Sequence, residues 1–294
     1  MIGYDDAMES TADIASPGAP SALGAQGVRA APDLPPTAAA SLGPPFELVN
    51  SGGKAPLVLV CDHASRALPD AYGTLGVDAA ELWRHIACDI GAADVTRRLA
   101  ELLDAPAVLA GYSRLLIDCN RATDDPSLIC PVSDGTAIPG NRNLGGAEKA
   151  RRIANYYAPY HAAIDEQLRR KEAANPNRAP ALIAMHSFTP VMNGNERPWH
   201  AGILWNRDGR IAKPLLQALA ADPAIVVGDN EPYSGRGNVG YTTRRHGEKA
   251  NLPHVSIEIR QNLIDTRHGA LAWADRLAAA LGRILPAVGR AAAP

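Results

Sequence analysis

The chain has 294 residues, of which 46% are hydrophobic and 20% are charged, and its 29 Lys and Arg residues nearly balance 31 Asp and Glu residues. The resulting net charge of −2 argues against a nucleic-acid-binding protein, which would carry a basic excess or stripe. No apolar stretch approaches the ~20 residues that a membrane-spanning helix needs, so an integral membrane protein is excluded. The length suits one large domain or two small ones, and either can bury a core.

The four cysteines indicate a protein of a reducing compartment. Cys61, Cys88, Cys119 and Cys130 show no CxxC spacing, which argues against a zinc ribbon and a thioredoxin motif. Four cysteines are also too few for a disulfide scaffold in a chain of this length. We therefore expect reduced thiols and a cytoplasmic location.

The first 45 residues differ in composition from the rest of the chain. They are rich in Pro, Ala, Gly and Ser and show neither helical nor strand periodicity. Asp5, Asp6 and Glu9 occupy the place of the basic region that a secretory signal would have. Such a segment buries too little apolar surface to offset its ordering entropy. We predict a disordered or loosely packed N-terminal extension over 1–45 and a catalytic domain over 46–294.

From Phe46 onward, short apolar runs alternate with longer segments that have helical spacing. The first run predicts a buried strand over Pro56–Cys61, and a helix over Asp78–Leu103 follows. The remaining predicted elements, in chain order, are strands over Ala107–Ala110 and Arg114–Ile117, a helix over Ala147–Ala174, strands over Ala181–Met185 and Ala201–Trp205, a helix over Ile211–Ala221, strands over Ala224–Val227 and Val255–Ile259, and a helix over His268–Leu285.

This alternation predicts the fold class. Strands that alternate with helices are typical of a mostly parallel or mixed sheet with helices on both faces. We find no internal repeat, and we expect a single α/β domain of the phosphorylase/hydrolase-like type. In open α/β sheets, sites form beyond the carboxyl ends of the strands. The polar residues that follow each strand are therefore the candidates for function.

Two histidines follow separate predicted core strands. His63 comes directly after the first strand, and His186 follows the run Ala181–Met185. Either histidine alone could simply stabilise a turn. Together, at the ends of two separate core strands, they suggest a metal site, because neutral imidazole is a common ligand for zinc and similar ions.

Asp89 is a carboxylate on the apolar stripe of the predicted 78–103 helix. A buried carboxylate must meet a cation or be protonated. Its partner could be an arginine, Arg84 or Arg114, or a metal shared with His63 and His186. Two histidines and one carboxylate with an open fourth position form a known catalytic zinc set.

The last predicted strand places Glu258 and Arg260 on one face, because side chains in a strand alternate. Glu258 could act as the general base toward a water activated by the metal. The alternative is a structural ion pair between these two residues.

Two arginines bracket the predicted strand at 114–117. Arg114 and Arg121 could hold an acidic substrate, because the guanidinium fork matches the two oxygens of a carboxylate. A structural pair between Arg114 and Asp118 is the alternative for the first of them. The segment 235–240 matches GxGxxG, but it follows a loop rather than a strand, so a dinucleotide fingerprint is not expected. We expect a glycine loop beside the site instead, leading to His246.

Taken together, these residues resemble the N-formylglutamate amidohydrolase family. The matching segments, which span most of 46–285, are CDHASRALP, CDIGA, SRLLIDCNR, AMHSFTP, YTTRRHG and LPHVSIEIRQNLID. The family is similar in fold to zinc carboxypeptidases, and its pattern is His-x-x-Glu, a distant His and a late Glu in an E-x-R segment. His63, His186 and Glu258 fit this pattern, but Arg66 stands where the glutamate ligand would be. We take Asp89 as the third ligand and Asp62 as the alternative.

The resemblance implies a metal-dependent amidohydrolase that cleaves the N-formyl or a small N-acyl amide of an acidic amino acid such as N-formyl-L-glutamate. It implies one divalent metal, taken as zinc, on His63, Asp89 and His186, with Glu258 as the catalytic base. The expected partner is a small molecule with carboxylate groups, and neither nucleic acid nor a membrane is expected. The alternatives are a zinc carboxypeptidase or N-acyl deacylase for larger substrates, and a non-catalytic anion-binding α/β protein. The candidate substrate-binding residues are Arg114, Asn120, Arg121, His246 and Arg260.

Overall fold

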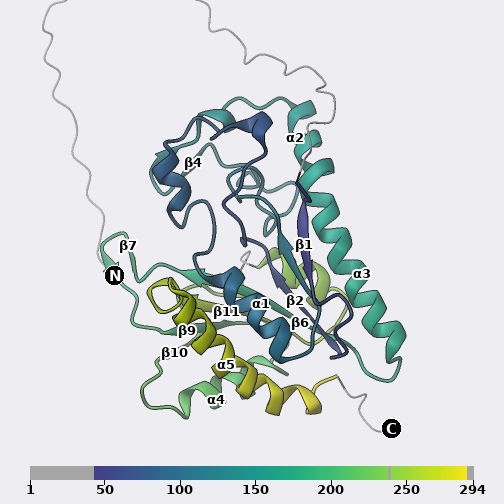
Figure 1. Ribbon diagram of the computed structural model, residues 1–294. Coiled ribbons are helices and arrows are strands. Elements are labelled where there is room, and N and C mark those ends of the chain that lie inside the picture. Colours follow the sequence, from purple (N-terminus) through teal and green to yellow (C-terminus); the bar gives the residue numbers. More distant parts are fainter. Residues whose placement is uncertain (1–42, 238–239, 290–294) are drawn as a thin grey trace, which may run out of the picture. The chain divides into compact units, whose positions relative to one another are not determined.

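A seven-stranded mixed sheet organises the chain. The computed structural model describes residues 43–237 and 240–289 (Figure 1), so the extension predicted over 1–45 lies almost wholly outside the described residues. The strand order is β1-β3-β2-β6-β11-β9-β10, with β3, β2, β6 and β11 parallel and with β9 antiparallel to β11. The strands are β1 (Phe46–Val49), β2 (Leu57–Cys61), β3 (Ala107–Ala110), β6 (Ala181–Phe188), β9 (Ala201–Leu204), β10 (Val227–Asp229) and β11 (His254–Arg260).

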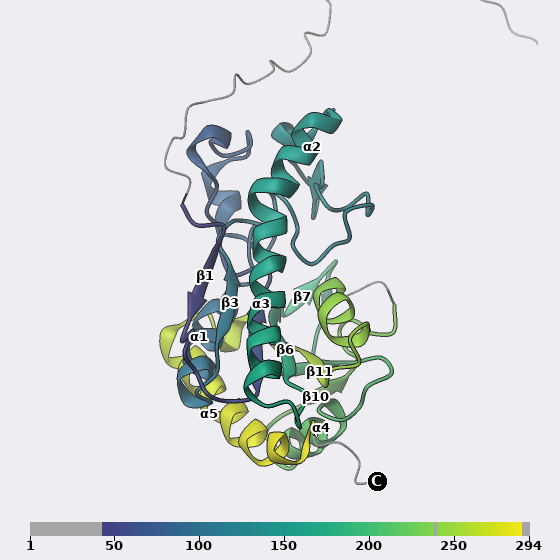
Figure 2. The same ribbon diagram turned by 90° about the vertical axis from the view of Figure 1, so that its right-hand side faces the viewer.

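Helices cover both faces of the sheet, as the alternating sequence pattern predicts. One face packs against α1 (Ala92–Leu102), α4 (Ala212–Ala220) and α5 (Arg267–Ile284). The other packs against α3 (Ala158–Ala174), which continues α2 (Gly146–Arg152) through a π-helical turn at Ile153–Tyr157. Figure 2 shows α3 running along the sheet on this second face. The predicted α/β class, with a mixed sheet, is confirmed.

Side-chain alternation divides the core into two layers. In β6, Ile183 and Met185 belong to the layer under α1 and α5, whereas Leu182 and Ala184 belong to the layer under α3. His186 continues the second series, so it lies on the α3 face of the sheet.

The predicted helix over Asp78–Leu103 is wrong in its first half. A 3₁₀ helix, η2 (Ala79–Trp83), and a series of turns precede α1, which begins only at Ala92. Gly91 is left-handed, with φ of 78°, and a Cβ atom there would lie 2.1 Å from the carbonyl oxygen of Ile264. This left-handed residue, where the two backbones approach closely, directly precedes the first residue of α1. Asp89 therefore lies in a loop rather than on a helix face.

Two strand predictions also need correction. Residues 114–117 form a turn, closed by the Leu116 N–H donating to the Ser113 carbonyl, and not a strand. The apolar side chains of this turn are buried against the 3₁₀ and α2–α3 regions, which gives the run its strand-like composition. The strand predicted at 224–227 begins only at Val227, as β10.

The remaining described elements are short. They are the hairpin strands β4 (Val132–Ser133) and β5 (Thr136–Ala137), the hairpin strands β7 (Val191–Met192) and β8 (Asn195–Glu196), the π helix η5 (Thr243–Glu248), and the 3₁₀ helices η1 (Asp70–Tyr72), η3 (Pro139–Asn141), η6 (Gln261–Leu263) and η7 (Leu285–Ala287).

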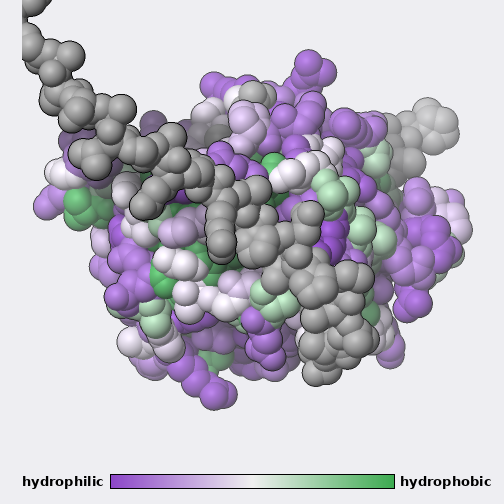
Figure 3. Space-filling view, turned by 90° about the horizontal axis from the view of Figure 1, so that it is seen from above, coloured by the Kyte–Doolittle hydropathy of each residue, from purple (hydrophilic) through white to green (hydrophobic). Residues whose placement is uncertain are grey.

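The described surface is mostly hydrophilic on the side seen in Figure 3. Among the helices that the structure describes, none has the length and apolar character needed to cross a membrane.

Candidate metal centre

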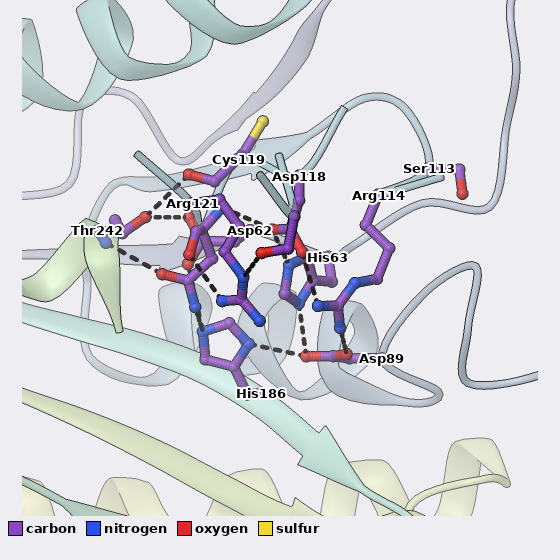
Figure 4. Close-up of polar contacts among 12 residues, drawn as sticks. Asp62, His63, Asp89, Ser113, Arg114, Asp118, Cys119, Arg121, His186 and Thr242 are labelled. Atoms are coloured by element: carbon purple, nitrogen blue, oxygen red, sulfur yellow. Dashed lines mark hydrogen bonds and ion pairs between the residues drawn. The ribbon is translucent and has the colours of Figure 1, made fainter. Parts of the chain in front are cut away.

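Three buried side chains meet at the carboxyl ends of β2 and β6 (Figure 4). His63 follows β2 directly, and His186 lies near the end of β6, two residues beyond Ala184, which pairs with Val60 of β2. Asp89 reaches them from the loop before α1, where its N–H donates to the His63 carbonyl over 2.9 Å. The structure therefore brings together the three residues predicted as metal ligands.

The spacing of the three groups suits a single metal ion. Asp89 Oδ2 lies 2.7 Å from His186 Nδ1 and 3.2 Å from His63 Nδ1. Ligand atoms at ~2.0–2.2 Å from a tetrahedral zinc ion are roughly 3.3 Å apart, so small shifts would accommodate an ion. All three side chains are less than a tenth exposed.

Each histidine is oriented by a second carboxylate at its outer nitrogen. His63 Nε2 lies 2.7 Å from Asp118 Oδ1, and His186 Nε2 lies 3.2 Å from Asp62 Oδ2. A carboxylate behind a ligating imidazole fixes the tautomer and directs the other nitrogen to the metal. Asp62, the alternative third ligand, thus approaches His186 from the side away from Asp89. Its Oδ1 accepts hydrogen bonds from Tyr160 (2.9 Å) and Thr242 (2.6 Å).

The buried carboxylates of this centre outnumber its one guanidinium, so they need either protons on the two histidines or a bound cation. Asp62, Asp89 and Asp118 face one guanidinium, that of Arg114, which lies 2.6 Å from Asp118 and 3.7 Å from Asp89. With both imidazoles neutral, as metal ligation requires, two negative charges remain. Without an ion, burial is outweighed by the neighbouring carboxylates, which raise the pKa of His63 and of His186, so that protons on the two rings balance these charges. Burial would raise the pKa of Asp118, but Arg114 and His63 hold it well below its usual range. Since unpaired buried carboxylates are costly, this donor set fits a divalent cation.

Glu258 lies beside the ligand set and has an unused oxygen. It is the register partner of His186 on β11, and it is 6% exposed. Its Oε2 is buried and has no hydrogen-bond partner among the described residues. Burial, opposed by the nearby His186, raises the pKa of Glu258 to about 7. A carboxyl group that titrates near neutrality can both accept and return a proton.

The alternative ion pair between Glu258 and Arg260 is not formed. Arg260 instead donates to Asn262 Oδ1 and to the carbonyl oxygens of Arg197 and Pro198, over 3.0 to 3.2 Å. Its guanidinium is therefore directed along the sheet edge rather than toward Glu258.

The other predicted substrate-binding residues occupy different places. Arg114 forms the structural pair with Asp118, which was the alternative for it. Asn120 lies within the centre, with Nδ2 3.4 Å from His186 Nε2 and with Oδ1 accepting from the N–H of Thr242. Arg121 Nε donates to Ser127 and its Nη1 to the Asn120 carbonyl. Among the described residues, neither Arg121 nor Arg260 has a carboxylate within ion-pair distance, but the donors of Arg260 are engaged by Asn262 and two carbonyl oxygens.

His246 lies outside the metal centre, in a buried chain of its own. Its Nε2 is 2.8 Å from His161 Nδ1, and its Nδ1 is 2.6 Å from Asp165 Oδ1. His161 Nε2 donates to the Cys119 carbonyl, 3.0 Å away. The ring of His246 thus joins η5 to α3 and does not face the ligand set.

Sequence reasoning missed Thr242, and it missed the contact between Asp118 and His63. Asp118 was expected only as a partner of Arg114, whereas its Oδ1 also lies 2.7 Å from His63 Nε2. Thr242 precedes η5, and no local pattern indicates that this segment folds back over the strand ends.

Comparison with known proteins settles the family. The sequence profile of the N-formylglutamate amidohydrolase family matches residues 55–265. The chain belongs to the N-formylglutamate amidohydrolase family. This membership confirms the resemblance predicted from the motifs.

Two curated relatives bear the name N-formylglutamate deformylase. The one from Pseudomonas aeruginosa is 29% identical over 179 residues, which cover 55% of this chain and 65% of that protein. The one from Pseudomonas putida is 26% identical over 230 residues, which cover 71% of this chain and 82% of that protein. The match thus spans about two thirds of the length of the first relative.

Two solved structures share the family fold. The gene product Atu2144 from Agrobacterium tumefaciens superposes with a TM-score of 0.79 at 37% identity, covering 83% of this chain and 96% of that one. The N-formylglutamate amidohydrolase from Ralstonia eutropha JMP134 gives a TM-score of 0.61 at 22% identity, covering 83% and 98%.

Proposed function

We propose that the protein is a zinc-dependent N-formylglutamate deformylase, which hydrolyses N-formyl-L-glutamate to formate and L-glutamate. The observation that carries this proposal is the buried, unpartnered Oε2 of Glu258 beside the His63–Asp89–His186 set. Family membership and the names of the curated relatives support the reaction. All four cysteines are free thiols, which suits a cytoplasmic enzyme.

His63, Asp89 and His186 would hold the ion. A divalent ion at this place supplies Lewis-acid chemistry, polarising the formyl carbonyl and acidifying the attacking water. Asp118 and Asp62 keep the two imidazoles in the tautomer that leaves Nδ1 of each free to ligate.

Glu258 moves the protons of the reaction. Its Oε2 accepts a proton from the water that attacks the formyl carbon. The same group then donates this proton to the amide nitrogen as the C–N bond breaks, so that glutamate leaves as a neutral amine. Both transfers are favourable for a group with a pKa near neutrality. Arg121, which has no acidic partner among the described residues, binds one carboxylate of the substrate.

The decisive experiment combines metal analysis with one substitution. Protein purified without a chelator should contain stoichiometric zinc by elemental analysis, and chelation should abolish turnover. Glu258→Gln should keep the fold and the metal while lowering kcat by roughly 10²- to 10⁴-fold, because the amide cannot accept the proton. Glu172→Gln, at an exposed position late in α3, is the matched control and should leave kcat unchanged.

Three outcomes would replace all or part of the proposal. Near-normal turnover of the Glu258→Gln variant would remove Glu258 from the mechanism. A panel of N-formyl, N-acetyl and dipeptide substrates tests the reaction itself, and a preference for dipeptides would indicate a carboxypeptidase. Protein without bound metal or turnover would favour a non-catalytic anion-binding protein.

A further inference from the structure

Arg197 is a further arginine at this end of the sheet that has no acidic partner among the described residues. It lies in the connection between β8 and β9 and is only partly exposed. Its Nη1 donates to the Tyr233 hydroxyl (3.0 Å) and to Thr189 Oγ1 (3.3 Å). The guanidinium carbon lies 5.0 Å from the ring centre of Tyr233 and 5.9 Å from that of Phe188. Within the described residues, no carboxylate comes within ion-pair distance of it.

The position of this arginine is fixed relative to the ligand set. Phe188 follows His186 by two residues in β6, so the two side chains leave the same face of the sheet. Arg260, the register partner of Phe188, donates from Nη1 to the Arg197 carbonyl over 3.1 Å. Arg197 therefore lies at the carboxyl ends of β6 and β11, beside Phe188.

The loop that carries Tyr233 packs beside the strand position opposite Glu258. The Glu231 carbonyl of this loop lies against Gly202, which is the register partner of Glu258. Burial raises the pKa of Tyr233, and the negative charge of Glu258 contributes. Because the phenol oxygen accepts from Arg197, its own proton is available to another acceptor. The pair thus offers guanidinium N–H groups and one O–H group at the same place.

Arg121 and Arg197, neither of which has a carboxylate within ion-pair distance among the described residues, lie on opposite sides of His186. Arg121 follows Asn120, on the β2 side of the centre. Arg197 precedes β9, on the β11 side, where its carbonyl accepts a hydrogen bond from Arg260 of β11. A substrate with two carboxylates would place one on each side of the ion, with its amide bond between them.

We propose that Arg197, with the Tyr233 hydroxyl, binds one carboxylate of the acidic substrate. This inference rests on the proposed deformylase function and adds the determinant that selects a dicarboxylate. The ring contacts hold the guanidinium in place while its outer N–H edge stays available, which is the geometry that favours bidentate recognition of a carboxylate.

The test compares one substitution on three substrates. Arg197→Met removes the charge and keeps most of the side-chain volume. The substrates are N-formyl-L-glutamate, N-formyl-L-norvaline, in which a methyl group replaces the side-chain carboxylate, and N-formyl-4-aminobutanoate, which lacks the α-carboxylate. Charged hydrogen bonds are worth enough to predict a loss of about 10- to 100-fold in kcat/KM on N-formyl-L-glutamate, mostly through KM.

The pattern across substrates identifies the contact. For the truncated substrate that lacks the carboxylate bound by Arg197, the substitution should change kcat/KM by less than about 3-fold, since the interaction is already absent. Arg207→Met, at a side chain that is 87% exposed, is the matched control and should change none of the three values. An equal loss on all three substrates, or no loss on any, overturns the proposal.

A binding measurement separates this inference from the proposed reaction. Calorimetry of L-glutamate should show at least about 10-fold weaker binding to the Arg197→Met variant than to the unsubstituted protein, with metal content equal in both. Equal binding, with normal hydrolysis by the unsubstituted protein, would overturn only the role of Arg197. Weaker binding by the variant, in a protein that never hydrolyses N-formyl-L-glutamate, would overturn only the deformylase function. If the unsubstituted protein neither binds L-glutamate nor hydrolyses the amide, both proposals fail.

Discussion

The predicted burial of Asp89 is confirmed, although the helix predicted to carry it is not. The predicted helix placed this carboxylate on an apolar stripe, and the requirement for a buried cation followed. The helix begins only at Ala92, yet Asp89 is buried and faces both histidines. The argument held because it depended on the burial of a charge, and apolar neighbours indicate burial in a loop as they do in a helix.

Substitution of Asp89 and of Asp62 should distinguish a metal ligand from a residue that only orients a ligand. Asp89→Asn preserves shape but removes the charge, so we expect the zinc affinity to fall by more than about 100-fold while the fold is kept. Asp62→Asn should lower it by only about 10- to 100-fold, because Asp62 acts through His186. Competition with a chromogenic chelator measures both affinities. Should Asp62→Asn prove the more damaging of the two, Asp62 would be the third ligand.

At the scale of the element, the chain His161–His246–Asp165 fixes η5 against α3. Burial, together with the charges of His246 and Arg245, lowers the pKa of His161 to about 3. The neutral ring then donates from Nε2 to Cys119 and accepts from His246 at Nδ1. This arrangement positions the segment that carries Thr242, whose hydroxyl group donates to Asp62.

His161 should make folding stability sensitive to acid. In the unfolded chain it titrates near 6.5, whereas in the folded chain it stays neutral to about 3. The unfolded state therefore binds more protons below pH 6.5, and stability is lost as the pH falls from there toward 3. Between pH 7 and 5 the loss due to this group is about 2 kcal/mol. Urea unfolding should show that His161→Gln loses that much less than the unsubstituted protein over this range; an identical pH dependence would exclude a neutral, buried His161.

Gly202 of β9 adjoins the loop that carries Tyr233. A Cβ atom at this position would lie 1.8 Å from the Glu231 carbonyl oxygen. Gly202→Ala should therefore displace the loop, lower stability by about 1–3 kcal/mol, and weaken binding of L-glutamate. Gly52→Ala is the control, because nothing lies within 4 Å of its added Cβ. Thermal unfolding and calorimetry check both effects, and an unaltered Tm for Gly202→Ala would show that the loop adapts without cost.

The limits of sequence reasoning are clearest for short elements. The central strands contain apolar runs or regular apolar alternation, and β2, β6 and β11 were predicted within a few residues. The turn at 114–117 is equally apolar, because it is buried by neighbours distant in sequence. Periodicity reports burial, and it cannot distinguish a buried strand from a buried turn of four residues.

For the whole molecule, the alternation of strands and helices predicted the sheet but not the direction of every strand. β9 pairs with β11 antiparallel, although the segment joining β9 to β10 is the helix of a parallel crossover. Nothing local in Ala201–Leu204 indicates this reversal, which depends on where the preceding hairpin returns the chain. Arg197 lies just before β9. The expectation that functional residues follow strands therefore does not point to it.

Removal of the first 40 residues tests the predicted domain boundary. The family profile begins at residue 55 and the described structure at residue 43. A chain starting at residue 41 keeps β1, which pairs with β3 and completes that edge of the sheet. We expect its Tm and kcat to match those of the full chain. A marked fall in either would show that residues 1–40 belong to the catalytic domain.

The hairpin of β7 and β8 has a consequence for the range of substrates. The carboxyl end of β6 lies at the end of the sheet that carries the metal centre. β9 begins at that same end of the sheet, because it runs antiparallel to β11. The connection 189–200 therefore returns beside the centre without crossing the sheet. Its length can change without altering the pairing of any strand. Natural insertions and deletions in this hairpin are thus expected to change which amides are accepted, while the catalytic groups stay in place. Substrate selectivity can then change among related proteins without a change in the reaction.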